Sequence, residues 1–221
     1  MNTPHDGQRA PARAGFTLLE LVLAACIFGL LLGGVTYFQS KASSHSREIS
    51  ARSRAETQAR RAVERVLDEL SGISSALLVP DPIGALGSDQ LTFQKPATVS
   101  NAGVVAWSTP DRLALALDDG ETDNGLDDDG DGLVDERKLV LTRAAGAANQ
   151  QVVTLCHGIA AWYPGETGNG VDDNANGATD ERGFNVQRIG DLLHVRVCVQ
   201  VAAGAGEVAD WTVDTAMRLR N

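Results

Sequence analysis

Apolar residues form one nearly unbroken run close to the N-terminus of this 221-residue chain. The run extends from Phe16 to Phe38 and contains a single charged residue, Glu20. As a helix it would be about 34 Å long, which is enough to cross a lipid bilayer. Residues 1–15 before it are polar and carry two arginines, so the positive-inside rule predicts that the rest of the chain lies on the far side of the membrane.

A narrower apolar stripe follows this run. Residues 39–72 are mostly polar, but small apolar residues recur every three or four positions, a spacing that places them on one face of a helix. The stripe consists of Ala55, Ala59, Ala62, Val63, Val66, Leu67 and Leu70. We therefore expect the helix to continue through 39–72 as an amphipathic segment and to end near Ser71 and Gly72.

Short apolar segments with turn residues between them dominate residues 73–221. The strand candidates are 89–96, 104–108, 112–118, 137–143, 151–162, 192–201 and 211–220. One long helix followed by antiparallel strands is an α+β architecture. We expect a transmembrane helix at 16–38, its amphipathic continuation at 39–72 and a β-rich globular domain at 73–221.

Charge and chemistry-bearing residues narrow the function. The formal net charge of −10 disfavours nucleic-acid binding through phosphate neutralisation. The four histidines lie in no Ser-His-Asp or G-x-S-x-G context, so we expect no enzyme. Of the three cysteines, Cys26 lies in the apolar run, which leaves Cys156 and Cys198 for the globular domain. Both lie in apolar strand segments, so a disulfide and two buried free thiols are open alternatives.

An acidic segment occurs twice, at 120–137 and 165–182, with 11 of 18 positions identical at a constant offset of 45. Two further aspartates extend the first copy to 118–137, and the two loops together hold 15 of the 29 acidic residues. So many carboxylates need either a cation or full solvation. We refer to 118–137 as the first loop and to 165–182 as the second loop, and expect each to form the tip of a hairpin.

The first loop contains D-x-D-x-D-G, which resembles the calcium loops of EF-hands, dockerins and thrombospondin-type repeats. Alternate side chains converge on one centre, the glycine allows a sharp turn, and the following carbonyl faces the ion. Oxygen ligands of this kind favour Ca²⁺. The candidate ligands are Asp127, Asp129, Asp131, the Leu133 carbonyl and Asp135, with Glu136 or Glu121 to close the site.

The second loop offers a similar set with less charge. Its candidate ligands are Asp172, Asn174, Asn176, the Ala178 carbonyl and Asp180, with Glu181 or Glu166 to close the site. Because asparagine supplies an oxygen but no charge, we expect weaker calcium binding here. The alternative for either loop is an acidic segment that stays in water without a bound ion.

The stretch Gly15-Phe16-Thr17-Leu18-Leu19-Glu20, followed by the apolar run, resembles the class III signal of type IV pilins and type II secretion pseudopilins. The resemblance implies that a prepilin peptidase removes the leader 1–15 and that Phe16 becomes the methylated N-terminus. Glu20 of one subunit would then pair with the Phe16 amine of a neighbour, because both charges are costly in lipid. The glycines at 29, 33 and 34 either allow close helix packing or mark a stretch that partly melts when a filament forms.

The order of the later segments is similar to that of a J-type minor pseudopilin or a PilW-like minor pilin. This implies a pilin-like fold and a structural role in a type II secretion or type IV pilus filament. The chain would be a single-pass protein of the bacterial inner membrane with its globular domain in the periplasm. Its partners would be other pilins or pseudopilins, the prepilin peptidase and the inner-membrane assembly platform. The alternative is a membrane- or filament-anchored, calcium-dependent adhesin.

Overall fold

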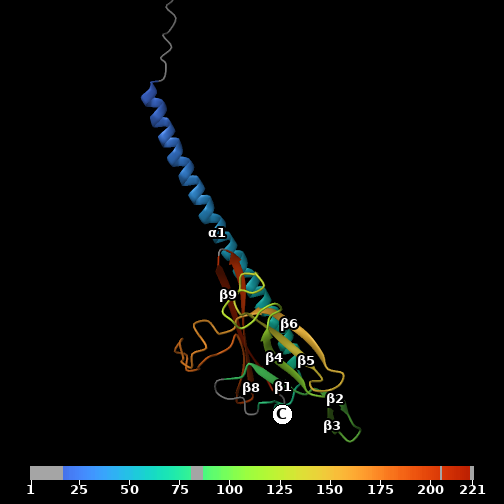
Figure 1. Cartoon of the computed structure of the whole chain (residues 1–221). Helices are drawn as coiled ribbons and strands as arrows, with labels where there is room; N and C mark the ends of the chain where they lie inside the picture. Colours follow the sequence, from blue (N-terminus) through green and yellow to red (C-terminus); the bar gives the residue numbers. More distant parts are fainter. Residues whose placement is uncertain (1–16, 81–86, 205, 220–221) are drawn as a thin grey trace, which may run out of the picture. The chain divides into compact units, whose positions relative to one another are not determined.

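The computed structural model describes residues 17–80, 87–204 and 206–219 (Figure 1). It contains one α-helix, α1, one 3₁₀ helix, η1, and nine strands among these residues. Their bounds are α1 (Leu18–Leu70), η1 (Ser75–Leu77), β1 (Gln90–Phe93), β2 (Pro96–Val99), β3 (Val105–Trp107), β4 (Asp111–Leu117), β5 (Arg137–Arg143), β6 (Gln151–Ile159), β7 (Phe184–Ile189), β8 (Leu192–Gly204) and β9 (Glu207–Arg218). The chain divides into two compact units, Met1–His45 and Ser46–Asn221.

In the first unit, the described residues belong almost entirely to α1 and are exposed all around the helix. The large apolar side chains from Leu18 to Phe38 are 49–83% exposed. This part of α1 is long and apolar enough to cross a membrane. Apolar side chains that cover a whole helix need lipid or neighbouring helices around them, so the segment is consistent with a single-pass anchor.

The second unit is built on one antiparallel sheet of seven strands in the order β1-β4-β5-β6-β8, with β7 and β9 both paired to β8. β9 follows one edge of β8 over its whole length, from Leu192↔Arg218 to Gly204↔Glu207. Two strands share the other edge: β7 pairs with Leu192–Val197, and β6 pairs at Val199. β2 and β3 form a separate two-stranded hairpin.

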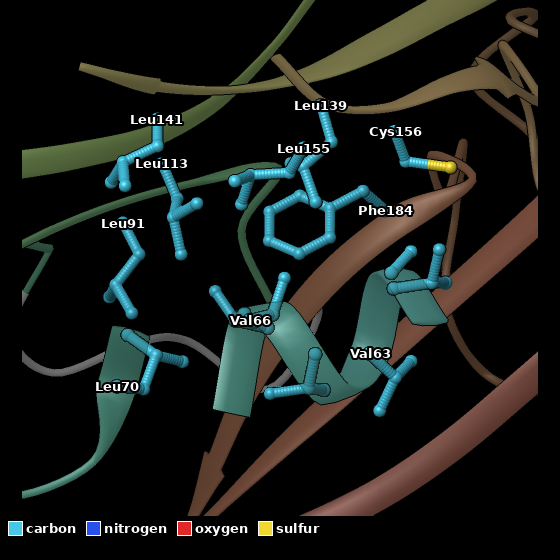
Figure 2. Close-up of a cluster of buried hydrophobic side chains, with 14 of the residues drawn as sticks. Val63, Val66, Leu70, Leu91, Leu113, Leu139, Leu141, Leu155, Cys156 and Phe184 are labelled. Atoms are coloured by element: carbon cyan, nitrogen blue, oxygen red, sulfur yellow. The ribbon is translucent and has the colours of Figure 1, made fainter. Parts of the chain in front are cut away.

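The amphipathic part of α1 covers one face of this sheet, and Figure 2 shows Val63, Val66 and Leu70 turned toward the strand side chains. The buried residues of α1 are Ala51, Ala55, Ala59, Ala62, Val63, Val66 and Leu70. The strand residues that meet them include Leu91, Leu113, Leu139, Leu141, Leu155, Cys156 and Phe184. The predicted stripe is confirmed, and so is the helix end, because Gly72 follows with a left-handed φ of 79°.

Ion pairs and hydrogen bonds fasten the last turns of α1 to the strands beside the core. The Glu69 carboxylate lies 2.6 Å from the Lys95 ammonium and 2.6 Å from the Arg143 guanidinium. One turn earlier, Arg65 Nη1 donates a hydrogen bond of 2.7 Å to the Leu155 carbonyl. These contacts hold the charged border of the helix against β5 and β6.

The α+β prediction with one long helix and an antiparallel sheet is confirmed, but two strands were not predicted. β2 lies in a segment for which no strand was predicted, and it pairs with β3, which was predicted at 104–108. β7 follows the second loop directly, and only two of its side chains, Phe184 and Val186, are fully buried. With two buried positions in six residues, the alternation of apolar and polar residues was too weak to predict this strand from the sequence.

The two cysteines of the sheet are free thiols, and the disulfide alternative is not realised. β6 and β8 pair at Ile159↔Val199, and the Ala160 amide donates to the Cys198 carbonyl at 3.0 Å. Cys156 therefore lies four residues away along β6, roughly 13 Å from the position opposite Cys198. A disulfide needs Cα atoms about 4.4–6.8 Å apart. Burial raises the pKa of both thiols to about 11, which keeps them protonated and unreactive.

The stripe gives a packing prediction. Ala59 is fully buried between α1 and the sheet, so Ala59→Leu should force the helix outward and lower the free energy of unfolding by about 1–3 kcal/mol. Thr57→Leu adds an apolar side chain at an exposed position of the same helix and should change the free energy of unfolding little. Chemical denaturation of the detergent-solubilised chain measures both, and equal effects of the two variants would contradict the packing described here.

Glu69 gives a pH prediction. Burial alone would raise its pKa, but the H-bonds and charges of Lys95 and Arg143 outweigh burial and lower it. A carboxylate with a lowered pKa stabilises the fold above its unfolded-state pKa, and this contribution is lost as the pH falls through the folded value. Glu69→Gln should therefore reduce thermal stability near about pH 7 and have a smaller effect below about pH 4.

The matched control for Glu69 is Glu56→Gln on the same helix. Glu56 pairs with Arg60 one turn away on the same helix, at a site open to solvent, so this change should be nearly neutral at both pH values. A Glu69→Gln effect that is the same at neutral and acidic pH would contradict the ionic origin of the contribution.

Candidate functional site

The two acidic loops occupy different places in the sheet (Figure 1). The first loop joins β4 to β5, which pair directly up to Leu117↔Arg137, so it forms the tip of a hairpin as predicted. The second loop lies between β6 and β7, which do not pair with each other but lie in line along the same edge of β8. The hairpin prediction is wrong for the second loop, because the strands that it joins are neighbours of β8 rather than of each other.

Each loop is organised around a buried glutamate near its start. Glu121 is 6% exposed, and its carboxylate accepts hydrogen bonds from the backbone amides of Asp128, Asp129 and Asp135 at 3.0–3.2 Å. Glu166 in the second loop is 5% exposed and accepts from the amides at positions 174 and 180, both at 3.1 Å. The carboxylate oxygens of these two glutamates accept hydrogen bonds from the loop backbone, and these bonds hold together segments that have no strand or helix.

Aspartates fix the turns of the first loop in the same way. Asp127 accepts from the amides of Gly130 at 2.7 Å and Gly132 at 3.0 Å. Asp135, which has a left-handed φ of 49°, accepts from two consecutive amides earlier in the loop, at positions 124 and 125. Side-chain acceptance by local backbone amides is the usual behaviour of aspartate in turns.

The second loop repeats this arrangement 45 residues later. Asp172 takes the place of Asp127, and Asp180, with a φ of 52°, takes the place of Asp135. Gly120 and Gly165 are also equivalent: a Cβ added to Gly120 would lie 2.9 Å from the Cβ of Asp129. The sequence repeat is therefore a structural repeat, in which several of the backbone hydrogen bonds and the close approach at Gly120 and Gly165 recur.

In the first loop, carboxylate oxygens gather closely enough to hold a metal ion. One group consists of Asp127, Asp129 and Asp131, and another of Glu121, Asp129 and Glu136; within each group the oxygens lie within 4.8 Å of one another. Asp129 belongs to both groups. The structure thus brings together most of the carboxylates predicted as ligands.

One of the predicted ligand positions, Leu133, has other contacts. The amide of Leu133 donates to Asp131 at 2.9 Å, and its side chain is buried. A third cluster, not predicted, is formed by Asp118 and Asp119 with His157, whose Nδ1 lies 2.7 Å from the Asp118 carboxylate. Asp118 also accepts from the Gly158 amide.

Among the carboxylates that the structure describes, Glu136 is the buried one with an oxygen that makes no hydrogen bond. It is 1% exposed, and its Oε2 has no hydrogen-bond partner among the described residues. Burial raises its pKa to about 7, with further contributions from the charges of Asp131, Glu121 and Asp129. A buried and unpartnered carboxylate oxygen surrounded by other carboxylates is costly, and a cation bound between them would remove that cost. The donor set therefore fits a metal ion.

The corresponding glutamate of the second loop has partners. Glu181 is 6% exposed, and its two oxygens accept from Arg196 Nη1 at 2.8 Å and from Asn176 Nδ2 at 2.6 Å. Arg196 comes from β8, also pairs with Asp214 at 3.1 Å, and lies over the ring of Tyr163 with its guanidinium carbon 4.6 Å from the ring centre. Among the residues that the structure describes, the second loop has no group of three acidic or histidine ligands within the same distance.

Arg196 was not predicted as part of a site. Its only signal in the sequence is its position as a charged residue in the apolar alternation of β8. Leu193, Val195, Val197 and Val199 point into the core, so Arg196 lies on the opposite face. That it meets Glu181 follows from the pairing of β7 with β8, which local patterns do not reveal.

Glu20, predicted to act in assembly, caps its own helix. The amide and the Oγ1 of Thr17 each lie 3.1 Å from Glu20 Oε2, and the Glu20 amide donates to Thr17 Oγ1 at 3.3 Å. This reciprocal pattern is a capping box, and the Thr-x-x-Glu spacing that signals it is present in the sequence. The other processing residues, Gly15 and Phe16, lie outside the described residues.

Comparison of the chain with protein-family models, with curated proteins and with solved structures gives no match. The site is therefore interpreted from its own geometry.

The organising role of Glu121 gives a prediction. Glu121→Gln replaces one accepting oxygen by an NH₂ group that faces backbone donors, so it should lower the free energy of unfolding by about 1–3 kcal/mol even in excess chelator. The control is Asp123→Asn, because the Asp123 side chain is 67% exposed and pairs with Arg137 at the surface; loss of this ion pair should cost less than about 1 kcal/mol. A Glu121→Gln variant as stable as the wild type in chelator would mean that these hydrogen bonds do not hold the loop.

Proposed function

We propose that this protein is a structural subunit of a periplasmic filament, a minor pseudopilin of a type II secretion system or a minor pilin of a type IV pilus. The observation that carries the proposal is the architecture of α1. Its N-terminal part is apolar and exposed all around, and its C-terminal part covers one face of an antiparallel sheet. The stretch from Gly15 to Glu20 stands directly at the start of this helix, where a prepilin peptidase would cut.

An exposed apolar helix of this kind suits a subunit that passes from a membrane into a filament. In the bilayer its side chains face lipid, and in a filament they would face the same helix of neighbouring subunits. The helix thus replaces one apolar environment by another. The soluble unit follows on the same helix, so every added subunit would carry its β-sheet to the filament surface.

Glu20 has a part in both environments. In the single chain its Oε2 accepts two hydrogen bonds from Thr17 and so closes the start of α1. Cleavage after Gly15 would create an α-amino cation at Phe16, and a carboxylate in lipid calls for such a partner. We propose that the Glu20 charge pairs with the Phe16 amine of an adjacent subunit while the capping bonds stay in place.

The acidic loops add a second element to the proposal. Carboxylate oxygens are the ligands that Ca²⁺ prefers, and the first loop gathers them around the buried Glu136. We propose that calcium holds this loop in its folded form, as a structural ion. The partners of the subunit would be other pilins or pseudopilins, the prepilin peptidase and the inner-membrane assembly platform, and no catalytic role is proposed.

Processing is the first test of this proposal. In cells that contain a prepilin peptidase, the chain should be recovered from membranes with Phe16 as its N-terminus, because Gly15 stands at the cleavage position. Mass spectrometry of the extracted protein reads this directly. Gly15→Val should leave the full-length chain. A wild-type chain that keeps Met1, or that is cut beyond Phe38, would contradict the family proposal.

Assembly is tested separately with Glu20→Gln. Glutamine also serves in a capping box, so this variant keeps the start of α1 and removes only the charge. It should be cleaved normally but be depleted from sheared or cross-linked filament fractions relative to the wild type.

A further inference from the structure

We propose that only the first loop takes a divalent cation, with Glu136 as its closing ligand, and that the Arg196 guanidinium takes the place of the ion in the second loop. The inference rests on the calcium proposal above and sharpens it. The sequence predicted two calcium sites of unequal affinity. We now infer one calcium site, in the first loop, and a second loop whose charge is neutralised by Arg196.

The first step is that the two loops have the same framework. Glu121 and Glu166 accept from equivalent backbone amides at 129 and 174 and at 135 and 180. Asp127 and Asp172 accept from equivalent amides at 132 and 177. The difference that matters for a cation then lies in the side chains that line the centre of each loop.

The second step concerns the closing glutamates. Glu136 and Glu181 are equally hidden, 1% and 6% exposed. Glu136 Oε2 has no hydrogen-bond partner among the residues that the structure describes, whereas both oxygens of Glu181 are bound by donors of the chain, Arg196 and Asn176. A buried carboxylate needs an opposite charge. Arg196 supplies this charge to Glu181, and we propose that a bound cation supplies it to Glu136.

The third step concerns the residues that face these glutamates. The first loop has Asp129 and Asp131, which can only accept or coordinate when they are ionised. The second loop has Asn174 and Asn176 at the same positions. The Nδ2 group of Asn176 donates to Glu181, and the buried Nδ2 group of Asn174 has no acceptor in the described structure. Two amide NH₂ groups in the centre of a loop are unfavourable neighbours for a cation.

The fourth step is that Arg196 is held in place by several contacts. Its guanidinium pairs with Glu181 and Asp214 and lies over the ring of Tyr163. Tyr163, 45 residues after Asp118, corresponds to it. The backbone carbonyl of Tyr163 accepts from the Glu166 amide at 2.9 Å, and that of Asp118 accepts from the Glu121 amide at 3.2 Å. The first loop thus has an aspartate where the second has the aromatic ring that supports the cation.

Counting bound calcium tests the inference. Equilibrium dialysis of the detergent-solubilised full chain against radioactive Ca²⁺, at about 1 mM free ion, should give one ion per chain. Glu136→Gln should weaken this binding by about tenfold or more, because it removes one ligand charge. Glu181→Gln, the matched change in the second loop, should leave the affinity and the count unchanged.

Melting temperatures provide a readout that separates the two glutamates further. Wild type should melt higher in calcium than in chelator, by mass action. Glu136→Gln should lose that rise and melt in chelator at least as high as the wild type, since a buried, unpartnered charge has gone. Glu181→Gln should melt lower under both conditions, because Arg196 loses a partner, but it should keep the rise with calcium.

Three results would overturn the inference. Two ions per wild-type chain would contradict the single site, and loss of an ion from Glu181→Gln would show that the second loop binds calcium after all. Full affinity in Glu136→Gln would show that another residue closes the first site. No bound ion and no calcium-dependent rise in melting temperature would overturn the calcium proposal itself, while cleavage at Gly15 would still stand as its own test of the filament proposal.

Discussion

The sheet depends on one helix face. The stripe from Ala51 to Leu70 is made of alanines, valines and a leucine, and its small members let α1 lie close to the strands. Inward side chains of β1, β4, β5, β6, β7 and β8 all converge on it. Without that face, Phe184 and the leucines of the central strands would be exposed to water. The sheet unit therefore cannot be separated from residues 46–70 of the helix, and the element that closes its core is the continuation of the exposed apolar part of α1.

A second constraint is electrostatic. Long loops without regular structure leave backbone amides unsatisfied unless side chains accept from them, and this chain meets that need with carboxylates. Glu121 and Glu166 each bind amides from distant parts of their own loop, and the aspartates bind those of the turns. The acids that order the backbone also concentrate negative charge. Once the amides are satisfied, the remaining charge must be balanced in another way, and Oε2 of the buried Glu136 has no hydrogen-bond partner among the described residues.

Local patterns were sufficient for the helix, its buried face, its end at Gly72 and most strands, because each depends on residues a few positions apart. They failed for β7, whose pairing with β8 gives it its role, and for the second loop, whose strands meet only through β8. The sequence left Glu121 and Glu136 as alternative closing ligands of the first loop, and that choice stays a prediction; the structure shows that Glu121 is engaged by backbone amides, which local patterns did not reveal. Arg196 depends on strand register and was not predictable. The capping box at Thr17 and Glu20 was local and could have been predicted.

The differences between the two loops form one consistent set. Several positions that build the backbone, among them Gly120, Gly125, Gly132 and the aspartates 127 and 135, are the same in both copies. Those that differ include Asn174 and Asn176, which lower the charge of the second loop, and Tyr163, which supports Arg196. Each of these differences reduces the need for an external cation. If the first loop binds a cation as proposed, one loop geometry would be stabilised in two ways: by a guanidinium fixed on β8 in the second loop and by a bound ion in the first. The order of the hairpin between β4 and β5 would then depend on the ion concentration of the surrounding medium, while the crossing from β6 to β7 would not.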